Sequence, residues 1–217
     1  MAEPFKLDSR LKLCASFVRE NSKVADIGTD HAYLPVWLCK KGIATKALAC
    51  DIGQEPLQNG IKTIEKYNAS HMVHTRLCNG LSKVMENEAD DIIIAGMGGE
   101  TIAEIIDGWQ YSKNNNKHFI LQPMTKSNEL IEYLYSSGFE IIKQDCCKER
   151  KIYTVMLAAF SGKKTPVTKE FTYLGKLSPK TNPIHREFLE MEIRNLENKA
   201  KGDLKYKNVV ENLKKEL

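Results

Sequence analysis

Two aspartates flank a glycine in the segment VADIGTD (residues 24–30), directly after an apolar run that predicts a buried strand. A strand that ends in a glycine turn and opens a helix directs backbone N–H groups at whatever binds above the strand's end. A dinucleotide site would need three glycines, and the carboxylates of Asp26 and Asp30 would repel its pyrophosphate. A ligand with a positive amine or sulfonium and no phosphate fits better, which favours S-adenosylmethionine. The alternative is that both acids only cap the helix and brace the turn.

Polar residues also follow the next two predicted strands. Asp51 closes the second strand, with Ile52 after it, and Asn79-Gly80 follow the third. In an open parallel sheet these ends lie at one edge, where ligands bind. From there Asp51 can accept two ribose hydroxyls and Asn79 can pair with an adenine edge. Each residue type is also a common loop former, so it is their coincidence on three strand ends that indicates a nucleoside cofactor.

The fourth predicted strand ends in Ala95-Gly96-Met97-Gly98-Gly99, where glycines permit a close backbone approach. The alternative is a plain flexible loop before the next helix. Enzymes that methylate exocyclic amino groups of bases usually carry Asp/Asn-Pro-Pro-aromatic here, and this chain does not. A ring nitrogen such as adenine N1 already has an in-plane lone pair, so it needs placement more than activation.

Four segments carry a resemblance to a known family. They are LDSRL (7–11), DIGTDHAYLP (26–35), IAGMGG (94–99) and LQP (121–123). In this order they resemble the bacterial tRNA (adenine-22-N1)-methyltransferases, and the likeness covers residues 7–160, with a looser match in the tail. The resemblance implies a class I fold that transfers the methyl group of S-adenosylmethionine to N1 of adenine 22 in the tRNA D-arm. The target base must then leave its stack to reach the site.

The resemblance also assigns expected roles to residues. We expect Asp30 nearest the chemistry, where it orients the adenine edge or takes the N6 proton as positive charge develops. We expect His31 to orient the cofactor or the target, Arg10 to meet the cofactor carboxylate or an RNA phosphate, and Tyr33 and Met97 to flank the flipped base. The alternatives are packing for His31, a surface ion pair for Arg10, and core filling for Tyr33 and Met97. The expected cofactor contacts are Asp26, Gly28, Asp30, His31, Asp51, Ile52, Asn79, Gly80, Ala95, Gly96 and Met97, and the expected substrate contacts are Arg10, Tyr33, Gly98, Gly99, Gln122 and Pro123.

Short apolar runs that alternate with amphipathic segments position these residues. They predict an α/β, Rossmann-like sheet of seven strands, in which five parallel strands are closed by an antiparallel hairpin. The hairpin follows because the link between the last two strands is too short for a crossover helix. The predicted strands are 23–27, 47–50, 72–77, 92–94, 119–121, 139–144 and 152–160, and the first two predicted helices are 8–20 and 32–40.

The last part of the chain has a different pattern. A Pro/Ser/Thr-rich linker runs to Pro183, and two apolar stripes separated by Gly202-Asp203 then predict a coiled-coil-like helical hairpin. We therefore expect a catalytic domain at 1–162 and a helical domain at 163–217. Residues 161–217 hold 13 Lys and Arg against 8 Asp and Glu, whereas the rest of the chain is nearly neutral. This excess suits tRNA binding, although an ordinary solvated helical surface has the same charge pattern.

Composition bounds the remaining possibilities. The chain of 217 residues has no apolar stretch that could span a bilayer and no signal-peptide pattern, so we expect a cytoplasmic protein that does not bind membranes and is a monomer. His71 and His74 lack a third ligand nearby, so no metal site is expected. Two other functions stay open, namely methyl transfer to a small molecule or protein, and RNA binding without turnover.

Overall fold

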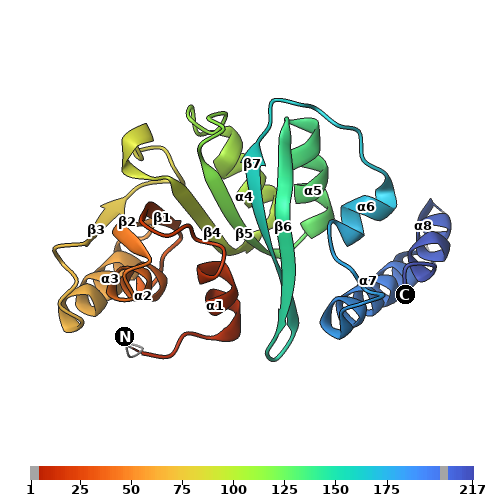
Figure 1. The fold of residues 1–217 in the computed structure, drawn as a ribbon, viewed down its shortest axis with the longest axis horizontal. Helices are drawn as coiled ribbons and strands as arrows, with labels where there is room; N and C mark the ends of the chain where they lie inside the picture. The colour runs from red at the N-terminus through yellow and green to blue at the C-terminus, as the bar shows by residue number, and fades with distance from the viewer. Residues whose placement is uncertain (1–4, 201–204) are drawn as a thin grey trace.

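A seven-stranded sheet forms the centre of the molecule, and the computed structural model describes residues 5–200 and 205–217 (Figure 1). The strand order is β3-β2-β1-β4-β5-β7-β6, in which β1 to β5 pair in parallel and β7 pairs antiparallel with both β5 and β6. This confirms the predicted Rossmann-like methyltransferase sheet. The strands are β1 (Ser22–Ile27), β2 (Ala44–Asp51), β3 (Val73–Leu77), β4 (Asp91–Gly98), β5 (His118–Thr125), β6 (Phe139–Lys148) and β7 (Ile152–Phe160).

Helices cover both faces of the sheet, as buried parallel strands require. One apolar core joins the sheet to α1, α2 and α3, and a second core joins the other face to α4 and α5. The two cores hold the β-branched run of β4 in the middle, with Ile93 on one face and Ile92 and Ile94 on the other. The helices are α1 (Ser9–Ala15), α2 (Tyr33–Lys40), α3 (Gln54–Lys66), α4 (Gly99–Asp107) and α5 (Ser127–Ser136), and a short 3-10 turn, η1, spans Glu86–Glu88.

The first helix is shorter than the predicted 8–20. It starts after Asp8, whose carboxylate accepts the Leu11 N–H, and it ends at Ala15. Beyond it, Arg19 donates to the fully buried Asp91 carboxylate at the start of β4, from its backbone N–H and from Nε, both at 2.7 Å. A buried carboxylate needs such partners. The helix therefore gives way to a turn that brings Arg19 to Asp91, and apolar periodicity alone does not reveal this.

Three helices follow the sheet: α6 (Lys169–Leu174), α7 (Pro183–Ala200) and α8 (Lys205–Lys214). The expected helical hairpin is present, because α7 and α8 share one apolar cluster. The prediction of a linker without helices up to Pro183 was wrong, since Thr168 caps α6 through its hydroxyl, which accepts the Phe171 N–H. The predicted break at Gly202-Asp203 lies outside the described residues. Within the described ranges, no helix is long and apolar enough to cross a membrane.

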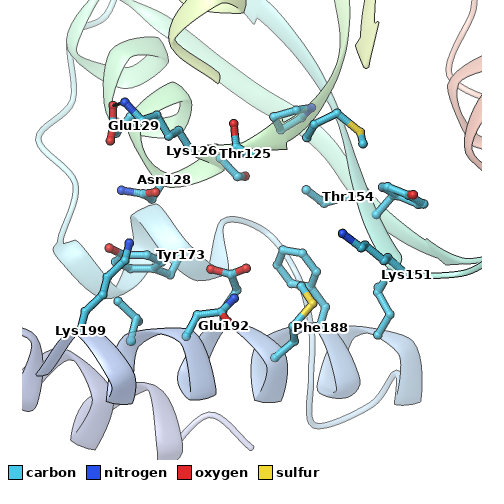
Figure 2. A pocket seen from close by; sticks show the side chains of 18 of the residues that line it. Thr125, Lys126, Asn128, Glu129, Lys151, Thr154, Tyr173, Phe188, Glu192 and Lys199 are labelled. Carbon is cyan, nitrogen blue, oxygen red and sulfur yellow. Dashed lines mark ion pairs between the residues drawn. The ribbon is translucent and has the colours of Figure 1, made fainter. Parts of the chain in front are cut away.

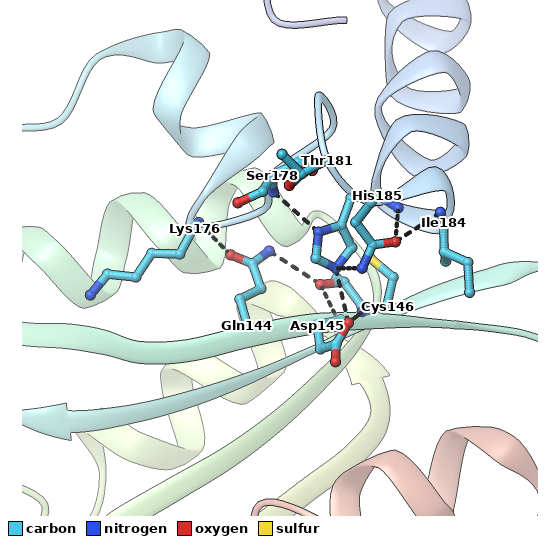
Figure 3. Close-up of polar contacts among 10 residues, drawn as sticks. Gln144, Asp145, Cys146, Lys176, Ser178, Thr181, Ile184 and His185 are labelled. Atoms are coloured by element: carbon cyan, nitrogen blue, oxygen red, sulfur yellow. Dashed lines mark hydrogen bonds and ion pairs between the residues drawn. The ribbon is translucent and has the colours of Figure 1, made fainter.

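A polar network attaches α7 to β6 (Figure 3). The imidazole of His185 is buried, and its Nε2 lies 2.9 Å from Oδ1 of Asp145 on β6. Its Nδ1 accepts the Ser178 N–H at 3.1 Å, so Nε2 carries the proton that is donated to Asp145. Beside it, Oε1 of Gln144 accepts the Lys176 N–H at 2.8 Å. These bonds fix the start of α7 against the end of the sheet.

Candidate active site at the carboxyl edge of the sheet

The turn after β1 has a backbone that side chains rarely adopt. Gly28, Asp30 and Ala32 all have positive φ, at +73°, +52° and +54°. At Gly28 a Cβ atom would lie 2.3 Å from Cε of Met97, the flexible end of that side chain, so it is the positive φ that favours glycine here. The turn is held from β2, because the N–H groups of Gly28 and Thr29 both donate to the Cys50 carbonyl, at 2.9 and 3.0 Å. The strand therefore ends in a fixed loop that presents Asp30 at the edge.

Asp26 lies beneath this turn and is buried. Burial raises its pKa to about 6 from an ordinary value of 3.8, and the hydrogen bond from Thr29 Oγ1, at 2.6 Å, opposes that rise. A carboxylate in such surroundings gains much from a nearby cation, because water no longer solvates its charge. Thr29 is a part of this arrangement that we did not predict from the sequence, although it stands between the two aspartates.

Asp51 joins the first and second strand ends. Its Oδ2 accepts the Asp30 N–H at 3.3 Å, and its Oδ1 accepts the Gly53 N–H at 2.8 Å. The Cys78 N–H donates to the Asp51 carbonyl at 2.9 Å, which places the exposed side chain of Asn79 beside it. The predicted cofactor residues of β1, β2 and β3 are thus brought together along one edge. Their neighbour Ile52 is 70% exposed, and Gly80 adopts a φ of +54°.

The end of β4 approaches the same turn. Ala95 is half-buried in the strand and Gly96 follows with a φ of +83°. The Met97 side chain extends over Gly28, as the contact of its methyl group shows. Gly98 precedes α4 as its N-cap. A Cβ at Gly99 would lie only 2.2 Å from the Lys126 carbonyl oxygen, so this glycine is required for the contact between α4 and the chain after β5.

Gln122, next to Pro123 on β5, is fully buried, and its amide has partners inside the protein. Its Oε1 accepts from Arg10 Nη1 at 2.9 Å and from the Gly96 N–H at 3.0 Å, and its Nε2 donates to the Pro123 carbonyl at 2.9 Å. The side chain therefore connects α1, the β4 turn and β5. Arg10 also lies 3.7 Å from Asp8, so the ion pair and the link to the site are both present.

The exposed rim of the site carries rings. His31 Nε2 lies 3.6 Å from Asp30 Oδ2, and its ring stacks on Tyr33 with centroids 5.4 Å apart. Tyr33 in turn makes an edge contact with Phe5 at 5.6 Å. The Asp30 side chain is 68% exposed. It is thus the carboxylate of the site that is most open to a second ligand.

The arrangement fits S-adenosylmethionine on its own chemistry. The buried carboxylate of Asp26 suits an ammonium group, and the exposed edge at Asp51 and Asn79 offers acceptors and donors for a nucleoside. Gly96 leaves its backbone open to a ligand, since a Cβ there would meet nothing nearer than Arg10 Nη1 at 3.6 Å, whereas the flexible end of Met97 covers Gly28. A separate cavity of about 600 Å³ lies elsewhere, between Pro123–Thr125 and α7.

Comparison with known proteins decides the family. A model described as "Methyltransferase domain" matches residues 7–156. The tRNA (adenine(22)-N(1))-methyltransferase of Bacillus subtilis is 33% identical over 154 residues, which are 70% of this chain and 65% of that protein. The chain belongs to the methyltransferase family that this domain model describes. S-adenosylmethionine is the cofactor of the family, as the sequence predicted.

Solved structures extend the likeness beyond the sheet to the helical tail. A Streptococcus pneumoniae structure described as "a putative tRNA (m1A22) methyltransferase, in complex with S-adenosyl-L-methionine" is 28% identical, with a TM-score of 0.88 over 98% of this chain and 100% of that one. The enzyme of M. capricolum, in complex with S-adenosyl-homocysteine, is also 28% identical, with a TM-score of 0.78 over 98% of this chain and 96% of that one. These two structures share both the sheet and the tail with this chain.

Proposed function

We propose that this protein transfers a methyl group from S-adenosylmethionine to N1 of adenine 22 in the D-arm of tRNA. The observation that carries the proposal is the set of carboxylates at the ends of β1 and β2, held around the Gly28 turn in a chain of this family. The activity of the Bacillus subtilis relative, a tRNA (adenine(22)-N(1))-methyltransferase, supports the choice of substrate. The chain matches 65% of the Bacillus protein's length, so its substrate and partners are part of the proposal.

The site residues divide the work between cofactor and base. Asp26 neutralises the ammonium of the methionine moiety, Asp51 accepts the ribose hydroxyls, and Asn79 contacts the adenine of the cofactor. The turn at Gly96 lets the ligand approach the backbone. Gly28, His31, Ile52, Gly80, Ala95 and Met97 complete this cofactor set, and Arg10, Tyr33, Gly98, Gly99, Gln122 and Pro123 form the proposed substrate side.

The protein contributes mainly alignment. The cofactor supplies a methyl group on a sulfonium, which passes to a nucleophilic nitrogen in one in-line displacement. Such a step depends on positioning and on the exclusion of water. Asp30 is the proposed catalytic residue, because its backbone is fixed by Asp51 while its carboxylate stays exposed at the rim. There it orients the target adenine and accepts a proton from N6 as the ring becomes positive.

The helical part at 163–217 forms the proposed second domain and contributes to tRNA binding. Its 13 Lys and Arg against 8 Asp and Glu supply positive charge for the phosphates. We propose that the protein acts in the cytoplasm, as a monomer.

Methyl transfer to unmodified tRNA transcripts tests the proposal. Labelled S-adenosylmethionine should be incorporated into a transcript with adenine at position 22 and not into a matched transcript with guanine there. Asp30→Ala should abolish turnover and leave cofactor affinity within about tenfold of the wild type, because Asp26 and Asp51 remain. Equal labelling of both transcripts would refute the site assignment. Loss of cofactor binding in the variant would make Asp30 a cofactor ligand instead.

A further inference from the structure

A cavity between the sheet and α7 has no role in the proposed chemistry. It measures about 600 Å³ and lies between the catalytic sheet and the helical tail. Its walls come from the end of β5, the start of α5, the tip of the β6–β7 hairpin and one face of α7 (Figure 2). This volume is in the range of small-ligand sites. Pro123, on its wall, is also one of the proposed substrate contacts.

Glu192 on α7 points into this cavity, between the rings of Tyr173 and Phe188 (Figure 2). Burial raises the pKa of its carboxyl group, and the charge of Lys199 opposes that rise. Among the described residues, no hydrogen bond or ion pair satisfies the Glu192 carboxylate. Two oxygens with acceptor capacity therefore face a cavity that also has aromatic walls.

Lysines stand on either side of this carboxylate. Lys151 is at the hairpin tip and Lys199 is on the far part of α7, with Glu192 between them in Figure 2. Lys199 lies 5.9 Å from the centre of the Tyr206 ring. No ion pair involves Lys151 or Lys199 within the ranges that the structure describes. Lys126, on the opposite wall, is paired with Glu100 and Glu129. The cavity is thus bordered by two lysines that form no ion pair among the described residues, of which Lys199 also lies over the Tyr206 ring, and it contains the carboxylate of Glu192.

A continuous phosphate track does not need a carboxylate at its centre, because phosphates repel it. An aromatic slot with a carboxylate is instead the chemistry that holds a nucleobase, which stacks on the rings and donates N–H groups to the oxygens. Lysines on both sides then meet the phosphates that flank the base. One arrangement explains both the carboxylate and the lysines: an RNA strand crosses the mouth of the cavity, and the base of one of its nucleotides inserts into the cavity.

We propose that this cavity binds one unpaired nucleotide of the tRNA, distinct from the methylated adenine, and that Glu192 accepts hydrogen bonds from amino or imino groups of its base. Lys151 and Lys199 bind the neighbouring phosphates. The inference rests on the proposed function, because tRNA is the partner. It makes the space between sheet and tail a second recognition site, which positions the D-arm while the target base occupies the first.

Two charge-matched variants test the role of Glu192. Glu192→Gln and Glu190→Gln each remove one negative charge from α7, but Glu190 does not line the cavity. General electrostatics predicts equal or tighter binding of an unmodified tRNA transcript by both. Our inference predicts that Glu192→Gln weakens tRNA binding by about tenfold, the loss expected for a hydrogen bond to a charged group, while Glu190→Gln does not. Affinity for S-adenosylmethionine and the melting temperature should be unchanged in both.

Equal or tighter tRNA binding by Glu192→Gln would overturn the inference. A second measurement covers the case in which that variant is unstable. Lys151→Ala should reduce the slope of log affinity against log salt by about one, whereas Lys62→Ala on α3 should leave it unchanged. A salt slope for Lys151→Ala equal to that of the wild type would also count against the site. If the wild-type protein binds no tRNA, the proposed function itself fails. If the wild type binds tRNA and the variants bind it equally well, only the inference about the cavity fails.

Discussion

Replacement of Asp26 by Asn separates the effect of the buried carboxylate on the stability of the fold from its effect on cofactor binding. In the folded protein the pKa of Asp26 is raised to about 6 from 3.8, because burial disfavours the charged form. The unfolded chain therefore loses this proton at a lower pH than the folded one. The free energy of unfolding is therefore higher at low pH, where Asp26 is protonated in both states. It falls as the pH rises from 3.8 through about 6, because the folded protein must then hold a buried charge.

The size of the effect follows from the same pKa values. Above pH 6 the charged Asp26 costs about 3 kcal/mol relative to an exposed aspartate, and at about pH 5 it costs about half of that. Asn at this position carries no charge at any pH. The difference in unfolding free energy between Asp26→Asn and the wild type should thus shift by about 1.5 kcal/mol in favour of the variant between about pH 5 and pH 7.5.

Urea denaturation of both proteins at the two pH values measures this difference, and titration with S-adenosylmethionine measures its counterpart. Cofactor affinity of the wild type should fall as the pH drops through about 6, because the protonated carboxyl no longer pairs with the ammonium. The variant should bind at least about tenfold more weakly, without this pH step. A stability difference that is the same at both pH values, or a variant with full affinity, would refute the reasoning.

Three further changes test other contacts of the site and its support. Gly28→Ala should weaken cofactor binding in calorimetry by about tenfold, since a φ of +73° strains an alanine and its Cβ would displace the end of the Met97 side chain; unchanged affinity contradicts this. Gln122→Ala should lower the unfolding free energy by about 2 kcal/mol, because Arg10 and a backbone N–H lose their acceptor, and an unchanged urea midpoint speaks against that role. His185→Ala should accelerate limited proteolysis before α7 while cofactor affinity stays constant; equal cleavage rates would show that the imidazole does not hold the tail.

The order of the sheet was predictable because each strand is a short apolar run that ends in a polar or glycine turn. The Ile92-Ile93-Ile94 run predicted the centre of the sheet, and the short link before Ile152 predicted the antiparallel hairpin. Because Asp26, Asp51 and Asn79 each stand at or just after the end of a predicted strand, the sequence alone predicted that they lie along one edge of the sheet. These features are local in sequence, so pattern and turn chemistry are enough.

Features that depend on distant partners were not predictable in this way. The early end of α1 depends on the contact between Arg19 and Asp91. Local polarity concealed α6, whose Phe171 packs on Tyr135 of α5 with ring centroids 5.1 Å apart. The cavity around Glu192 arises only when α7 docks on β6 through His185, and a single acid on an amphipathic helix gives no signal of it.

Primer extension on treated tRNA tests the central claim most directly, because a methyl group on adenine N1 blocks the pairing edge that reverse transcriptase must read. After incubation of an unmodified transcript with the protein and S-adenosylmethionine, we predict that extension stops one nucleotide before adenine 22. The stop should be absent without the cofactor and with Asp30→Ala. Read-through to the full-length product, or a stop at a different nucleotide, would contradict the account.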